Sequence, residues 1–257
     1  MTVPPRLFET AALALKPTRY GPMMYFPADR LAGRSLDLYG EWCEGELRLM
    51  RQGIQADDWV VDFGAGIGTH TVALAKAAPQ GRVVAVEADR AAFQALAGNL
   101  ALNGLDNVRV YHAAAEAAAG VDAPVLQLDA LALERCNFIR IDLDGPEGLA
   151  ALRGAGETIR RHRPILYVAN NTAAGSAELI AETARLGYRC WWHFCHYFNA
   201  DNHFRNPNNV FDGVRPEASL LCTPAEFNAE IGGLMPLAGA DDNYIRAGER
   251  LMAQRRG

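Results

Sequence analysis

The sequence predicts an α/β fold in which a mostly parallel β-sheet is covered by helices on both faces. Two observations predict it. Short apolar runs suited to buried strands alternate with longer segments of helical spacing between residues 59 and 187. A cluster of glycines directly follows the first apolar run, at the place where a parallel sheet binds its ligands. Each strand–helix–strand repeat implies a right-handed crossover, which places helices over the sheet.

The chain begins with a segment of different character. Residues 1–40 are rich in proline, glycine and aromatic residues, and we interpret them as an N-terminal extension with one short strand at residues 23–26. Residues 41–53 place Trp42, Leu47 and Met50 at near-helical spacing and end in glycine, which predicts an amphipathic helix. No linker of low complexity follows, so residues 41–257 are expected to form a single domain.

The predicted strands and helices of this domain alternate regularly. Strands are expected at residues 59–63, 82–88, 108–115, 138–144 and 164–170, with a further strand at 218–224. Helices are expected at residues 69–78, 90–104, 148–162 and 176–187. The aromatic segment at 188–198 and the turn-rich segment that follows it belong to a tail of different composition.

Composition excludes several classes of protein. The formal net charge is −5, so no global positive field attracts phosphate backbones, and we expect no nucleic-acid partner. No apolar run has the length of a membrane span, and Glu9 interrupts the short apolar stretch at the start, so a cytoplasmic location is expected. An odd number of irregularly spaced cysteines indicates reduced thiols, at Cys43, Cys136, Cys190, Cys195 and Cys222.

The glycine loop discriminates between two adenine-containing cofactors. Gly64, Gly66 and Gly68 are spaced G-x-G-x-G, whereas a dinucleotide fingerprint requires its third glycine at Thr69. Glu87 ends the second strand, where a carboxylate accepts hydrogen bonds from the hydroxyls of a ribose. Both classes of cofactor use such a carboxylate, and the alternative is that Glu87 only ends a strand.

Asp62 shifts the balance towards S-adenosylmethionine. It stands two residues before the first glycine and is expected to face the same cleft. A carboxylate there suits a cofactor with a sulfonium or ammonium charge and is poorly placed beside a pyrophosphate. The alternative is that Asp62 only accepts hydrogen bonds from loop amides.

Three segments, read together, resemble the FkbM family of class I S-adenosylmethionine-dependent methyltransferases. They are VVDFGAGIGTHT with its motif at residues 62–71, VVAVEADR with residues 87–89, and FIRIDLDGPE with Asp142 and Asp144. The resemblance covers residues 35–224 and implies a Rossmann-like fold with S-adenosylmethionine as the cofactor. The cofactor site expected on this basis consists of Tyr39, Glu46, Asp62, Gly64, Ala65, Gly66, Gly68, Thr69, Thr71, Glu87, Ala88, Asp89, Ala114 and Asp142.

The same resemblance implies the acceptor, a hydroxyl group of a sugar, glycan or secondary metabolite. Methylation of a hydroxyl is helped by a general base, because the alcohol loses its proton as the new bond forms. Asp142 and Asp144 are the first candidates, since alternation places both on one face of the strand end. The alternative is that the pair caps the following helix.

The tail supplies further candidates. His193 and His196 are expected to act as bases or substrate contacts, or else to belong to an aromatic strand packed on the sheet. The amide-rich segment 199–210, with His203 and Arg205, suits a polyhydroxylated acceptor or is a solvated loop.

No metal is expected, although a weak pattern is present. Some O-methyltransferases hold a divalent cation near the ends of the fourth and fifth strands, and Asp142, Asn170 and Asn171 echo that arrangement. The family's branch carries acidic residues at the end of the fifth strand, where this chain has Ala169, Asn170 and Asn171.

Two rival functions remain. One is an NAD-dependent oxidoreductase, which the glycine spacing disfavours. The other is a binding module that keeps the fold but has lost turnover, which the missing carboxylates at the end of the fifth strand would suit. The sequence leaves the oligomeric state open.

Overall fold

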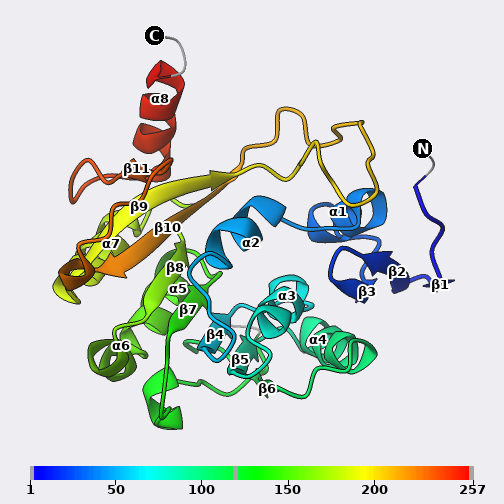
Figure 1. Ribbon diagram of the computed structural model, residues 1–257, viewed down its shortest axis with the longest axis horizontal. Coiled ribbons are helices and arrows are strands. Elements are labelled where there is room, and N and C mark those ends of the chain that lie inside the picture. The colour runs from blue at the N-terminus through cyan, green and yellow to red at the C-terminus, as the bar shows by residue number, and fades with distance from the viewer. Residues whose placement is uncertain (1–2, 118–120, 255–257) are drawn as a thin grey trace.

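An eight-stranded sheet forms the centre of the computed structural model, which describes residues 3–117 and 121–254 (Figure 1). Its strands are β4 (Trp59–Phe63), β5 (Arg82–Glu87), β6 (Val108–His112), β7 (Phe138–Ile141), β8 (Ile165–Ala169), β9 (Tyr188–Cys195), β10 (Glu217–Pro224) and β11 (Met235–Pro236). They lie side by side in the order β11-β9-β10-β8-β7-β4-β5-β6. Strands β4 to β8 are parallel to one another, and β10 is antiparallel to both of its neighbours.

The order of the strands positions the site. The chain runs from β4 outwards to β6, and then returns to place β7 and β8 on the other side of β4. The loops that leave the carboxyl ends of β4 and β7 therefore diverge, and such a switch point is where open α/β sheets bind ligands. The predicted mostly parallel sheet is confirmed.

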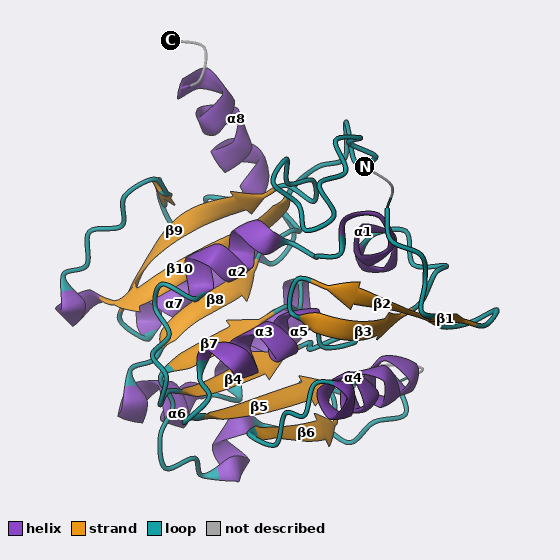
Figure 2. Ribbon diagram, turned by 45° about the vertical axis from the view of Figure 1, so that its right-hand side comes forward, coloured by secondary structure: helices purple, strands orange, loops and turns teal. Residues whose placement is uncertain are grey.

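Helices cover both faces of this sheet (Figure 2). On one face lie α2 (Glu44–Met50), α3 (Thr69–Ala77) and α4 (Arg90–Leu102), and on the other α5 (Gly145–Arg153), α6 (Gly156–His162) and α7 (Ser176–Arg185). Val60 of β4 packs with α2 and α3, whereas Val61 packs with α5 and α7. Because both faces of β4 are buried, its residues are apolar on both sides of the sheet, with Asp62 as the exception.

A second, smaller sheet stands beside the first. It is antiparallel and consists of β1 (Phe8–Glu9), β2 (Ala14–Thr18) and β3 (Gly21–Tyr25), followed by α1 (Ala32–Tyr39). The buried Asn99 side chain of α4 holds it, since it accepts from Met24 N at 2.7 Å and donates to Met24 O at 3.0 Å. The sequence predicted only the last of these strands, and the division at residue 40 stays a prediction.

Three segments refine the expectations drawn from the sequence. The single helix expected at 148–162 is two helices, because the chain leaves helical geometry at Ala155. The aromatic segment forms β9, in which Trp192 is 1% exposed. The C-terminal α8 (Tyr244–Gln254) projects from the body of the molecule, as Figure 1 shows. Short 3-10 turns lie at Leu128–Leu131 and Ala225–Phe227.

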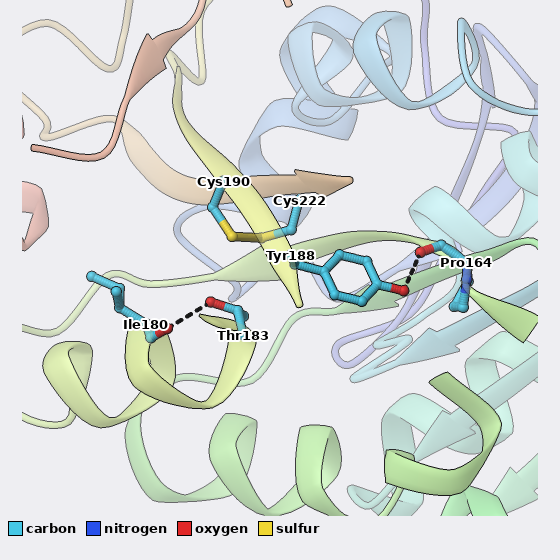
Figure 3. The surroundings of a disulfide bond; sticks show 6 residues. All are labelled: Pro164, Ile180, Thr183, Tyr188, Cys190 and Cys222. Atoms are coloured by element: carbon cyan, nitrogen blue, oxygen red, sulfur yellow. Dashed lines mark hydrogen bonds between the residues drawn. A yellow bond between two sulfur atoms is a disulfide. The ribbon is translucent and has the colours of Figure 1, made fainter. Parts of the chain in front are cut away.

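The expectation of reduced cysteines is wrong for one pair. Cys190 and Cys222 lie directly opposite each other on β9 and β10 and form a disulfide (Figure 3). The odd count and irregular spacing concealed the pair, since only strand pairing brings two cysteines 32 residues apart together. Cys43, Cys136 and Cys195 are buried free thiols.

Within the described residues, none of the helices combines the length and the apolar character that crossing a membrane requires.

Candidate active site

The glycine loop joins β4 to α3 and has the backbone that its sequence requires. Gly64, Gly66 and Gly68 have φ values of 74°, 55° and 89°, in the left-handed region that favours glycine. A Cβ on Gly64 would lie 2.5 Å from the carbonyl oxygen of Asp142, so a side chain there would force β4 and β7 apart. A Cβ on Gly66 would meet no atom within 4 Å, because this residue faces open space.

Glu87 fixes the loop from the neighbouring strand. Its carboxylate accepts hydrogen bonds from the amides of Gly66 and Asp89, both at 2.7 Å. Burial raises the pKa of Glu87, although these two backbone bonds oppose the rise. Glu87 lines a small cavity of about 70 Å³ with Gly64, Ala88 and Ala114.

A larger cavity of about 470 Å³ continues on the other side of Gly64. The loop contributes Gly64, Ala65, Gly66 and Thr69, and the start of α4 contributes Asp89. The remaining walls come from Trp42, His70, Arg140 and Asp142, and from the N-terminal segment through Phe26, Asp29, Leu31 and Ala32. Gly64 lines both cavities, so they adjoin at the carboxyl end of β4, and we refer to the two cavities together as the cleft.

Arg140 supplies a buried positive charge at the wall of this cleft. Its guanidinium donates to Asp62 Oδ1 at 2.8 Å and to Asp142 Oδ2 at 2.6 Å, and its side chain is 3% exposed. Although burial opposes the charge, the two carboxylates raise the pKa of Arg140, so it remains a cation.

Asp62 does not face the cleft, which corrects the expectation drawn from its position. It is fully buried, pairs with Arg140, and accepts from Thr71 Oγ1 at 2.7 Å. Thr71 is buried as well, and its hydroxyl is already used in this hydrogen bond. Asp62 and Thr71 stabilise the base of the glycine loop from inside the protein. A carboxylate excluded from water must be paired and hydrogen-bonded by buried groups.

Of the two carboxylates that Arg140 holds, Asp142 is the one that reaches the cleft. One of its oxygens is held by Arg140, while 44% of its side chain is exposed towards the cavity. Desolvation by the surrounding walls raises the pKa of Asp142, and the attraction of Arg140 does not reverse that shift. A carboxylate that is oriented by a cation and has a raised pKa suits a general base.

Asp144 does not share this position. It is the N-cap residue of α5, lines neither part of the cleft, and accepts from the amide of Asn171 at 2.7 Å. The expectation of two carboxylates in one site is therefore wrong, because the chain leaves the strand after Ile141 and alternation ends there.

His193 and His196 are also separated from Asp142. They line another cavity of about 180 Å³ with Gly45, Arg48 and Cys195, and it shares no lining residue with the cleft. His193 Nδ1 lies 2.7 Å from the hydroxyl of Tyr167, and burial lowers the pKa of His193. β8 and β10 lie between β9 and β7, the strand that Asp142 follows, and spacing along the chain does not reveal this order of strands.

Tyr39 and Glu46 lie behind the cleft instead of lining it. Tyr39 is fully buried, donates to Asn208 O at 2.6 Å and accepts from Val210 N at 2.9 Å, so it anchors the asparagine-rich loop. Glu46 Oε2 lies 3.1 Å from His70 Nε2. Burial opposes ionisation of Glu46, but His70 brings the pKa of Glu46 below its usual value.

The weak metal pattern gains no support. Among the described residues, no three histidines, cysteines or acidic residues lie close enough together to hold a metal ion. Asn171 Oδ1 accepts from the amide of Ala218 at 2.7 Å and is thereby occupied.

The predicted cofactor residues divide into two groups. Those that line the cleft are Gly64, Ala65, Gly66, Thr69, Glu87, Ala88, Asp89, Ala114 and Asp142. Those that support it from outside are Tyr39, Glu46, Asp62, Gly68 and Thr71. Sequence reasoning missed Trp42, His70 and Arg140. His70 and Arg140 lie inside quoted motifs, and their polar character in apolar surroundings was an available signal.

Comparison with known proteins identifies the kind of domain. A family model described as the TRM5/TYW2 methyltransferase domain matches residues 38–128, less than half of the chain, and this range contains the glycine loop and Glu87. The cofactor is S-adenosylmethionine. Among curated proteins, no sequence matches this chain.

Two solved structures support the fold. A transferase from Pyrococcus horikoshii is 14% identical, with a TM-score of 0.54 over 84% of this chain and 72% of that one. TYW2 from the same organism, solved with MeSAdo, is 14% identical with a TM-score of 0.52 over the same shares. FkbM methyltransferase from Methylobacillus flagellatus is 22% identical with a TM-score of 0.47, over 65% of this chain and 44% of that one. This chain thus spans less than half the length of that protein.

These findings establish a class I methyltransferase fold and correct one expectation. The prediction of no nucleic-acid partner is contradicted, because the TRM5/TYW2 family acts on tRNA. The net charge was a poor guide here, because it sums the charges of the whole surface, whereas a nucleic acid is bound by one local patch of that surface. Membership of the FkbM family stays a prediction.

Proposed function

We propose that this protein methylates RNA, with S-adenosylmethionine as the methyl donor. The observation that carries the proposal is the match of residues 38–128, which contain most of the cleft residues, to the methyltransferase domain of a family that acts on tRNA. O-methylation of a sugar or metabolite, which the FkbM resemblance implied, has no support from the comparisons.

The cleft fits this cofactor at both ends. Glu87, in the small cavity, has carboxylate lone pairs left to accept hydrogen bonds from a ribose, and Ala88 and Ala114 offer apolar contact to an adenine. Gly66 leaves room for close approach along the loop. S-adenosylmethionine supplies an electrophilic methyl group when bound.

Asp142 and Arg140 perform the protein's part of the chemistry. The acceptor atom must lose a proton as its bond to carbon forms, and Asp142 is the group in the larger cavity that takes that proton. Arg140 keeps Asp142 in one orientation through the 2.6 Å hydrogen bond. The N-terminal walls, Phe26 and Leu31, add apolar surface that helps to exclude water.

A second candidate is methyl transfer to a hydroxyl of a small polyhydroxylated acceptor. The observation that favours it is the loop 199–210, whose Asn199 and His203 are held by Glu41 through hydrogen bonds of 2.8 Å each. Such an ordered array of amide side chains suits hydrogen bonding to hydroxyl groups.

Transfer of labelled methyl groups tests both candidates. The protein is incubated with S-adenosylmethionine labelled in its methyl group and, separately, with total tRNA and with a panel of free sugars and nucleosides. We expect label in tRNA, carried by the nucleotides that alkaline hydrolysis of the RNA yields. Label in a sugar and none in tRNA would overturn the proposal in favour of the second candidate, and no label in any acceptor despite cofactor binding would favour a binding module.

A further inference from the structure

We propose that Trp42 is a stacking platform for a nucleobase of the acceptor, an inference that rests on the proposed RNA substrate. Trp42 is a large, half-buried aromatic side chain, and it lines the same cavity as Arg140 and Asp142. The roles proposed above for binding the cofactor and for accepting the proton are filled by other residues, so they do not explain why an indole ring lines this cavity.

The ring is held rigidly from behind. Trp42 stacks on Tyr197 with ring centroids 5.1 Å apart and an interplanar angle of 17°. Tyr197 is fixed in turn, because its hydroxyl donates to Glu217 at 2.7 Å and its ring packs against Phe211. A pre-ordered aromatic ring loses little conformational entropy when a second planar group stacks on it, which is what a base platform requires.

The rim of the cavity suits a nucleotide better than a neutral sugar. Arg30 stands between the lining residues Asp29 and Leu31, and Arg90 directly follows the lining residue Asp89. Both arginines are exposed, and neither forms an ion pair or a side-chain hydrogen bond with any residue that the structure describes. Their guanidinium groups are therefore available to phosphate, while Asp29 and Asp89 accept hydrogen bonds from backbone amides.

Tryptophan fluorescence tests the platform without turnover. Guanosine monophosphate is titrated into the protein, with methyl α-glucoside as a neutral sugar probe. We expect the nucleotide to quench the fluorescence of the wild-type protein and of Trp59→Phe, the matched control at the amino-terminal end of β4. We expect it to have little effect on the fluorescence of Trp42→Phe. Quenching by the glucoside and not by the nucleotide would overturn the proposal.

Steady-state kinetics with tRNA gives the second readout. We expect Trp42→Ala to raise KM for tRNA about tenfold or more, with cofactor affinity unchanged by calorimetry, and Trp42→Phe to restore most of the loss. An unchanged KM in Trp42→Ala would overturn the platform while RNA methylation stands. Nucleotide quenching that depends on Trp42, without any methyl transfer to tRNA, would overturn the RNA proposal while the platform stands.

Discussion

At the scale of the residue, the cleft depends on one buried cation between two carboxylates. Arg140 pairs with Asp62, which is out of contact with water, and with Asp142, which faces the cavity. The first pair stabilises the base of the loop and the second orients the proposed base. A substitution of Arg140 therefore tests the stability of the fold, and a substitution of Asp142 tests the chemistry.

Removal of the proposed base should abolish turnover and leave binding intact. We expect Asp142→Asn to lower kcat by about 100-fold while the affinity for S-adenosylhomocysteine, measured by calorimetry, changes little. Because Asp142 acts in its ionised form and its pKa is raised, the acid limb of the wild-type rate should lie above the ordinary carboxylate range. An Asp142→Asn variant with unchanged turnover and the same acid limb would remove this assignment.

Arg140→Met tests the buried pair through stability. The substitution leaves the Asp62 carboxylate buried without its cation, at a cost of about 3–5 kcal/mol in the free energy of unfolding. Denaturant unfolding measures it, with Arg135→Met as a control, because Arg135 pairs with Asp57 on the surface and should lose less than about 1 kcal/mol. Equal losses in both variants would contradict the role given to Arg140.

At the scale of the element, Tyr39 joins α1 to the asparagine-rich loop. Tyr39→Phe removes one hydroxyl and leaves Val210 N and Asn208 O without that partner. We expect a loss of about 1–3 kcal/mol and faster amide exchange or proteolysis within residues 199–211, while the sheet stays protected. Unchanged exchange in that loop would show that other contacts, such as those of Glu41, are sufficient.

The start of α8 depends in the same way on Asp242. Although burial opposes its ionisation, hydrogen bonds from Arg250, Ala238 and Trp192 lower the pKa of Asp242 to about 2. A carboxyl whose pKa is lower in the folded state contributes stability above its unfolded pKa of roughly 4, and that stability is lost as pH falls towards 2. We expect Asp242→Asn to make the free energy of unfolding depend less on pH, as measured by denaturant unfolding between pH 2 and 6. An unaltered pH dependence would contradict the role given to Asp242.

At the scale of the whole molecule, the net charge of −5 and the proposed RNA substrate predict shallow salt dependence. If Arg30 and Arg90 are the groups that contact phosphate, the plot of log K for tRNA against log salt concentration should have a slope of about −2. Each Arg→Ala variant should reduce that slope by about 1. A steep slope that neither variant alters would place the RNA on another surface.

The sequence by itself determined the parallel sheet and the glycine loop. These follow from local rules, because apolar runs form buried strands, and a glycine can adopt the backbone of Gly64 where Asp142 approaches it. The position of Glu87 beside the glycine loop likewise follows from its place at the end of β5.

Only the tertiary structure decided which polar residues meet in the cleft. Asp62 and Asp142 both lie near the carboxyl ends of neighbouring strands, yet one is buried against Arg140 and the other faces the cavity. The insertion of β10 between β8 and β9 removed His193 from the site, and the fold of the N-terminal segment brought Phe26 and Leu31 into it. Strand order and burial arise from contacts distant in the chain, and spacing along a sequence does not record them.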